Sequence, residues 1–255
     1  AESAVENARE QMSRLIGTTP HEITFTSGAT ESINLAIKGI YQAYSNKGNH
    51  IITCATEHKA VLDTCKQLEQ FGAKITYLPV NKTGQIDLNQ LDTSISDSTI
   101  LVSIMMANNE TGVIQPISQI AEIAHRHGIA FMSDATQAIG EIPVNVDEMG
   151  IDIMAFSAHK FYGPKGVGGL FLKKQPSRIA IAPQQVGGGQ ERGLRSGTLN
   201  VPGIVGLGKA AELCFEEMQG EQIRLRDIQQ ILETELKSSF QAAINGEAAL
   251  RLPNV

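Results

Sequence analysis

The feature that most constrains the fold of this chain is a regular alternation of short apolar strands with amphipathic helices. The segment Ile100–Met106 (ILVSIMM) is almost continuously apolar, which is typical of a strand covered on both faces of a sheet. Segments with apolar residues at helical spacing separate such strands over most of the chain. The alternation predicts an α/β fold with a mainly parallel sheet flanked by helices.

The expected elements divide the chain into three parts: an opening helix over 1–16, an α/β domain over 17–200 and a helical extension over 201–255. The predicted strands are Glu22–Thr26, His50–Cys54, Lys74–Pro79, Thr99–Met106, Ile129–Ser133, Ile151–Ser157 and Gly168–Lys173. The predicted helices of the α/β domain are Thr30–Tyr44, Ala60–Phe71, Leu88–Ser94 and Ser118–His127. In the extension, helical periodicity covers Val205–Met218 and Ile223–Ala243.

Composition excludes several classes of function. A net charge of −6 argues against a basic nucleic-acid surface, and no apolar run approaches the ~20 residues that span a bilayer. The three cysteines, Cys54, Cys65 and Cys214, are widely spaced, which argues against a disulfide framework and a zinc site. We therefore expect a cytoplasmic protein with no metal site and neither nucleic acid nor membrane as a partner.

Polar loops follow most of the predicted strands. Ligands of open α/β sheets bind outside the carboxyl ends of the strands, so these loops are the place to search for a site. The loops are Ser27–Glu31, Thr56–His58, Asn108–Gly112, Asp134–Gln137 and Ala158–Lys160. Their convergence on one edge predicts a ligand site there.

The first of these loops suits a phosphate group. Ser27-Gly28-Ala29-Thr30 offers backbone amides, a hydroxyl and a helix N-terminus. For this loop alone, the simpler interpretation is that Ser27 or Thr30 is an ordinary N-cap. A dinucleotide or a nucleoside triphosphate is disfavoured because neither a Gly-x-Gly-x-x-Gly motif nor a Walker lysine accompanies it.

Lys160 and Asp134 point to pyridoxal phosphate chemistry when they are taken together. Lys160 directly follows an apolar strand, and a desolvated amine has a lowered pKa suited to Schiff-base formation. Asp134 ends a buried strand and needs a cationic partner, such as the pyridinium nitrogen of that cofactor. The alternatives are a lysine that reaches water and an aspartate that caps the turn at Ala135. His58 either stacks on a flat ring or caps a loop.

A glycine-rich loop over 187–198 (GGGQERGLRSGT) carries two arginines. Such a loop can reach an anion or a neighbouring subunit. Composition alone favours a solvated linker.

Several motifs stand in a fixed order: SGATE at 27–31, EHKAV at 57–61, NNETG at 108–112, DATQ at 134–137, SAHKFYGPKG at 157–166 and RGLRSGT at 192–198. In this order, and over essentially the whole chain, the sequence resembles the cysteine desulfurases. These belong to the class V aminotransferase group of fold type I pyridoxal-phosphate enzymes. The resemblance points to the branch that feeds sulfur to iron–sulfur clusters and thiolated tRNA, and it implies the large cofactor domain of a homodimer.

The resemblance also implies residue roles. Lys160 would carry the cofactor as a Schiff base, Asp134 would hold the pyridinium nitrogen and His58 would stack on the ring. Asn109 and Gln137 would contact the side of the ring that carries the phenolic oxygen. Ala29, Thr30, Ser157 and His159 would surround the phosphate. Thr198 would reach a phosphate in the partner subunit.

The chemistry implied by the family is removal of sulfur from L-cysteine, giving alanine and a persulfide on a catalytic cysteine that passes sulfur to an acceptor such as an iron–sulfur scaffold. The family's N-terminal stretch is not in this sequence. Its C-terminal domain, which carries the catalytic cysteine and a carboxylate-binding arginine, is also not in this sequence. Cys54, Cys65 and Cys214 all fall within predicted elements, so we expect the chain by itself to be inactive. Alternatives are a selenocysteine lyase, another class V aminotransferase or a non-catalytic cofactor-domain scaffold.

Overall fold

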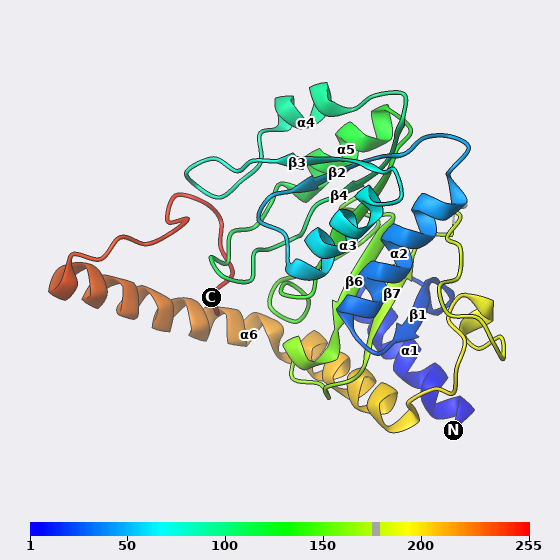
Figure 1. The fold of residues 1–255 in the computed structure, drawn as a ribbon. Helices are drawn as coiled ribbons and strands as arrows, with labels where there is room; N and C mark the ends of the chain where they lie inside the picture. Colours follow the sequence, from blue (N-terminus) through cyan, green and yellow to red (C-terminus); the bar gives the residue numbers. More distant parts are fainter. Residues whose placement is uncertain (175–178) are drawn as a thin grey trace.

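A seven-stranded sheet forms the centre of the molecule (Figure 1). The computed structural model describes residues 1–174 and 179–255. The strand order is β1-β7-β6-β5-β4-β2-β3, and β7 is antiparallel to both of its neighbours whereas the other pairs are parallel. The strands are β1 (Ile23–Thr26), β2 (His50–Cys54), β3 (Lys74–Leu78), β4 (Thr99–Ser103), β5 (Ala130–Asp134), β6 (Ile153–Ser157) and β7 (Gly168–Leu172). The predicted α/β fold with a mainly parallel sheet is confirmed.

Helices cover both faces of the sheet, and Figure 1 shows α2 and α3 on one of them. The helices are α1 (Glu2–Ile16), α2 (Ala29–Ala43), α3 (Lys59–Glu69), α4 (Leu88–Ser94), α5 (Ile117–Arg126) and α6 (Val201–Phe240). Short 3-10 turns occupy Pro20–Glu22, Ala158–Lys160 and Glu191–Gly193. The two helical stretches predicted after residue 201 form one continuous helix of 40 residues. Gly220 lies within it, and a glycine weakens a helix by about 1 kcal/mol without removing a hydrogen bond.

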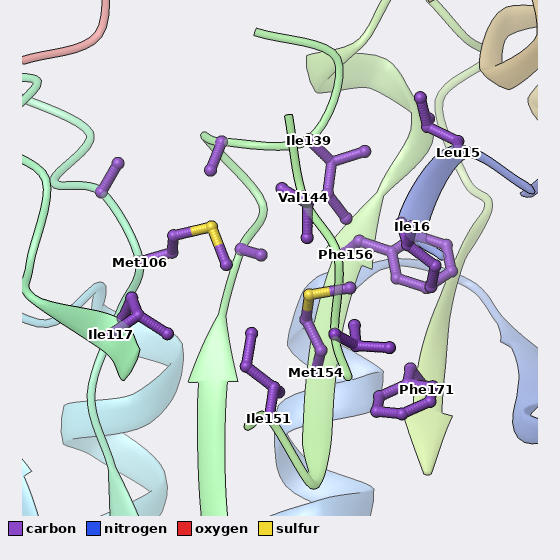
Figure 2. Packing of buried hydrophobic residues seen from close by; sticks show 14 of the residues in the cluster. Leu15, Ile16, Met106, Ile117, Ile139, Val144, Ile151, Met154, Phe156 and Phe171 are labelled. Atoms are coloured by element: carbon purple, nitrogen blue, oxygen red, sulfur yellow. The ribbon is translucent and has the colours of Figure 1, made fainter. Parts of the chain in front are cut away.

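Successive side chains along the strands belong alternately to two separate apolar clusters, one on each face of the sheet. Ile52 belongs to the cluster that includes residues of α1, α5 and α6, whereas its neighbour Ile51 belongs to the cluster that includes residues of α2 and α3. Figure 2 shows part of the first cluster, including Ile16 of α1 and Phe171 of β7. Burial on both faces explains why the strands are apolar throughout rather than alternating.

The ends of several strands differ by a few residues from our predictions. Strand β4 ends at Ser103 instead of Met106, because its last register partner on β2 is Thr53 and β2 itself ends at Cys54. Strand β5 extends one residue further than predicted and includes Asp134. The chain beyond β4 stays close to β5, where the N–H of Met106 donates to the carbonyl of Asp134 at 2.9 Å.

The parallel strands direct their following loops to a common edge of the sheet. Strands β1, β2, β4, β5 and β6 all end there, so loops far apart in the sequence meet. Among the described residues, no helix combines the length and the apolarity needed to cross a membrane.

Candidate functional site

A cavity of about 460 Å³ lies at the carboxyl edge of the sheet. This volume suits a small-molecule ligand. Most of the predicted site residues line it: Ala29, Thr30, His58, Asn109, Asp134, Gln137, Ser157, His159 and Lys160. Thr198 does not; its side chain is exposed on the glycine-rich loop.

One end of the cavity is the N-terminus of α2. The N-cap is Gly28, at φ +152° and ψ 178°, and no side chain caps the helix. The simpler interpretation of Ser27 or Thr30 as the N-cap is therefore wrong. A Cβ on Gly168 would lie 2.7 Å from the Cα of Gly28, so a second glycine permits the close approach of β7. The first-turn amides of Ala29 and Thr30 are left to bind an anion.

Side chains from the end of β6 complete this anion-binding end. The Ser157 Oγ and the His159 Nδ1 share a hydrogen bond of 2.8 Å. Burial, followed by the positive charges of Lys160 and Lys165, lowers the pKa of His159. At neutral pH this imidazole is uncharged, so the positive charge at this end comes from the two lysines and the helix N-terminus.

Asp134 lines the cavity and is 5% exposed. Its Oδ1 accepts the Thr136 N–H at 3.0 Å and the Thr136 hydroxyl at 2.5 Å. The alternative of a turn cap is thus correct for one oxygen, while Oδ2 has no protein partner among the described residues. Burial raises the pKa of Asp134, against the hydrogen bonds from Thr136 and the charge of His58. A cation in the cavity would stabilise the ionised carboxylate.

His58 has two roles in the structure. Its Nδ1 accepts the Ala60 N–H at 3.1 Å and so caps α3. This bond requires the tautomer with the proton on Nε2. The same ring lines the cavity, so the two alternatives that the sequence left open are compatible.

Lys160 lies in the 3-10 turn after β6 and lines the cavity, but its side chain is exposed. The expectation of a desolvated amine is wrong for this structure, because the turn carries Lys160 beyond the buried end of the strand. The alternative of a strand-end lysine that reaches water describes it instead.

The glycine-rich loop is anchored and is not a solvated linker. Glu191 is buried and accepts hydrogen bonds from both terminal nitrogens of Arg9, each at 2.9 Å, and from the Phe25 N–H at 2.8 Å. Arg195, in the same loop, binds Glu31 at the start of α2. Composition could not reveal these anchors, since their partners lie far away in the sequence.

The three cysteines are buried, as their predicted positions within β2, α3 and α6 indicated. Burial is the main cause that raises the pKa of Cys54 and Cys214, the latter to about 11. Burial, with the charges of Glu57 and Glu69, raises the pKa of Cys65 to about 12. At neutral pH all three are therefore unreactive thiols.

Two charged residues of the cavity were not among our predicted site residues. Glu31 and Lys165 both line it. Each belongs to one of the sequence motifs described above, so the sequence indicated that it lies near the site. The sequence did not indicate that its side chain faces the cavity.

The donor set fits a flat phosphorylated heterocycle that carries a carbonyl group. Amides of α2 and Lys165 meet the phosphate, and the free oxygen of Asp134 meets a ring N–H⁺. His58 can cover a ring face, and the Lys160 amine can condense with the carbonyl. Pyridoxal 5′-phosphate has each of these features.

Comparisons with known proteins find similar sequences. The sequence model of the aminotransferase class-V family matches residues 1–255. A protein named cysteine desulfurase IscS from Ehrlichia chaffeensis is 53% identical over 253 residues, which are 99% of this chain and 62% of that protein. Another of the same name, from Salmonella paratyphi C, is 51% identical over 255 residues, 100% of this chain and 63% of that protein. The chain thus spans less than two thirds of these curated relatives.

Solved structures are also similar. A NifS-like protein superposes with a TM-score of 0.92 at 40% identity, covering 99% of this chain and 68% of the other. The structure described as SspA in complex with cysteine gives a TM-score of 0.79 at 42% identity, covering 87% of this chain and 66% of the other.

Proposed function

This chain belongs to the aminotransferase class-V family, and on that premise we propose that it is the cofactor-binding domain of a pyridoxal-5′-phosphate-dependent cysteine desulfurase. The observation that carries the proposal is the cavity in which Lys160, Asp134 and the N-terminus of α2 meet. When bound, the cofactor supplies a carbonyl that condenses with amines and a ring that accepts electrons from a bond broken nearby.

The chain's own residues hold and orient this group. The amides of Ala29 and Thr30, with the Ser157 hydroxyl, bind the phosphate, and Asp134 keeps a proton on the ring nitrogen. His58 stacks on the ring, and Asn109 and Gln137 contact its oxygen substituent. Asp134 is suited to its role because one oxygen is fixed by Thr136 while the other faces the cavity.

Lys160 is the proposed attachment point and proton carrier. Its amine reaches the cavity without a hydrogen bond or ion pair to the described residues, so it can form a bond to a carbonyl and release it again. Once released, the amine can accept and return a proton at the carbon next to the substrate nitrogen.

L-cysteine is the proposed substrate, and an acceptor protein such as an iron–sulfur scaffold is the proposed destination of the sulfur. Support comes from the relatives named cysteine desulfurase and from the structure of SspA with cysteine. The buried thiols of this chain are unsuited to take up sulfur, so we propose that the accepting thiol belongs to another part of the protein. We also propose a homodimer in which the exposed Thr198 reaches the partner's phosphate.

Borohydride reduction after incubation with pyridoxal phosphate tests the proposal. Peptide mass mapping is expected to find the reduced cofactor on Lys160. Lys59→Ala is the matched control, since Lys59 begins α3 next to His58 but does not line the cavity, and it should leave the modification in place. Modification of Lys165 or Lys59 in place of Lys160 would overturn the assignment.

A further inference from the structure

Three buried side chains near the proposed cofactor site have polar atoms without a hydrogen-bond partner among the described residues. These atoms are the Thr53 Oγ1, the Ser103 Oγ and the Glu57 Oε2. The residues are 0%, 1% and 5% exposed, respectively. Burying such atoms unpaired is costly, and buried polar atoms without a protein partner are commonly satisfied by an internal water.

The hydroxyls of Thr53 and Ser103 lie on the same face of the sheet. Thr53 of β2 and Ser103 of β4 are register partners in a parallel pair, so their side chains leave the sheet on the same face. Ile51 and Leu101, two residues earlier on each strand, pack in the cluster with α2 and α3. Thr53 and Ser103 therefore face the layer beneath these helices.

The carboxyl group of Glu57 lies near the ends of the same two strands. Its Oε1 accepts the N–H of Met105 at 2.5 Å, two residues beyond Ser103. The backbone N–H of Glu57 donates to the carbonyl of Cys54, the last residue of β2, at 3.3 Å. Glu57 thus lies at the ends of β2 and β4, next to the strand positions that carry the two hydroxyls.

No cationic side chain among the described residues forms an ion pair with Glu57. The titratable groups around it are Cys54 of β2, Cys65 of α3, Asp134 of β5 and its own neighbour His58. Burial raises the pKa of Glu57 well above its ordinary value; the Met105 amide opposes this shift, and the charge of Asp134 adds to it. A buried carboxyl without a cation is most stable in its acid form.

We propose that Thr53, Ser103 and Glu57 bind one internal water molecule and that Glu57 is held there as a neutral carboxylic acid beside the ionised Asp134. The hydroxyls and the acid can both donate to and accept from this water, which satisfies all three atoms. Because Glu57 carries no charge, it does not compete with Asp134 for a cation in the cavity. This consequence for Asp134 rests on the proposed function; the water site itself does not.

The protonation of Glu57 can be measured through the pH dependence of stability. Unfolding exposes the carboxyl, which then releases its proton above about pH 4.3. Between pH 5 and pH 8 the unfolding constant of the wild-type chain, divided by that of Glu57→Gln, is expected to rise by up to about tenfold per pH unit. The exposed Glu122→Gln is the matched control and should show no such slope. If the ratio of the wild-type and Glu57→Gln unfolding constants also stays constant between pH 5 and pH 8, the proposal is overturned.

A second measurement does not depend on the stability of any variant. In ¹³C NMR of the wild-type chain, the Glu57 carboxyl carbon should keep the chemical shift of a protonated acid at pH 7. A shift typical of a carboxylate at that pH would contradict the neutral acid.

A high-resolution crystal structure tests the water. We expect one ordered water within hydrogen-bond distance of all three side chains, and its loss or displacement in Thr53→Val. Direct hydrogen bonds among Thr53, Ser103 and Glu57 with no water between them would overturn this part. None of these readouts needs the cofactor, so failure to bind pyridoxal phosphate would count against the proposed function alone.

The neutrality of Glu57 beside Asp134 has its own readout. Glu57→Gln replaces one neutral donor by another, so the pH dependence of the visible spectrum of bound pyridoxal phosphate should be unchanged in this variant. A spectral transition that moves in pH in Glu57→Gln would show that Glu57 carries a charge beside Asp134.

Discussion

Arg195 binds Glu31 across 164 positions of sequence, with its Nε 2.6 Å from Oε1 and its Nη2 3.2 Å from Oε2. The Glu31 Oε2 also accepts the N–H of Ser27 at 2.7 Å. Burial alone would raise the pKa of Glu31, but the hydrogen bonds from Arg195 and Ser27 outweigh it and lower the pKa. The pair joins the glycine-rich loop to the anion-binding end of the cavity and neutralises a carboxylate there.

Arg195→Gln is expected to weaken the binding of pyridoxal phosphate about tenfold, because the freed charge of Glu31 repels the phosphate, at a cost of about 1.4 kcal/mol. Absorbance titration with the cofactor measures the affinity. The double variant Arg195→Gln, Glu31→Gln should recover most of the loss. An unchanged affinity in the single variant would mean that the pair only holds the loop.

Asp134→Asn should weaken cofactor binding about 10-fold to 100-fold, since an amide cannot neutralise a ring N–H⁺. The folded-state pKa of Asp134 is raised, so above the unfolded pKa of about 3.9 its ionised form costs stability. The cofactor-free Asn variant should consequently melt no lower than the wild type at pH 7. Asp227→Asn, an exposed site, is the control for both measurements. A large drop in melting temperature would instead indicate a structural cap.

The chain by itself is expected to release no sulfide from L-cysteine in the presence of a reductant. Its thiols are buried, and the pKa values of Cys65 and Cys214 are raised to about 12 and about 11, so the thiolate fraction at pH 8 is negligible. A disulfide exchange reagent should react slowly with the native chain and quickly with the unfolded one. Sulfide release that disappears when one cysteine is replaced by serine would refute this prediction.

Arg9→Met should lower the free energy of unfolding by about 3–5 kcal/mol, the usual cost of leaving one partner of a buried ion pair alone. Both partners are nearly fully buried, with side-chain exposures of 3% and 1% for Arg9 and Glu191. Urea denaturation measures the loss, which should shrink in the double variant Arg9→Met, Glu191→Gln. Arg226→Met, at an exposed position of α6, is the control and should change stability little.

His125 is expected to make stability depend on pH. Its hydrogen bond to Asp152, at 2.8 Å, is the main cause that raises its pKa. The charged pair therefore contributes fully below about pH 6.5 and is lost as the pH rises through the folded-state pKa. Since the His125 side chain is 42% exposed, solvent limits the contribution to under about 1 kcal/mol. His125→Gln should be destabilised at pH 5.5 relative to the wild type, and the gap should narrow by pH 8.5.

The sequence determined the architecture and most of the residues of the cavity, because both depend on local pattern. Strands buried on both faces must be apolar throughout, and parallel strands must send their following loops to one edge. The loops after β1, β2, β4, β5 and β6 could thus be assigned to one place without knowing the strand order. The same argument predicts that the loops of Ala29, His58, Asp134 and Lys160 meet, and all four residues line the cavity.

Only the tertiary structure decided the environment of each side chain. Lys160 and Glu57 stand at similar places after strands, yet Lys160 is exposed and Glu57 is buried. Likewise, composition favoured a solvated linker for the glycine-rich loop, but its Glu191 forms a buried ion pair with Arg9. The burial and the ion pairs of a side chain depend on which distant helix, strand or loop packs over it. The free energy of a charged side chain depends steeply on that burial and on nearby charges. A pattern read along the chain fixes neighbours in sequence, whereas these groups are governed by neighbours in space.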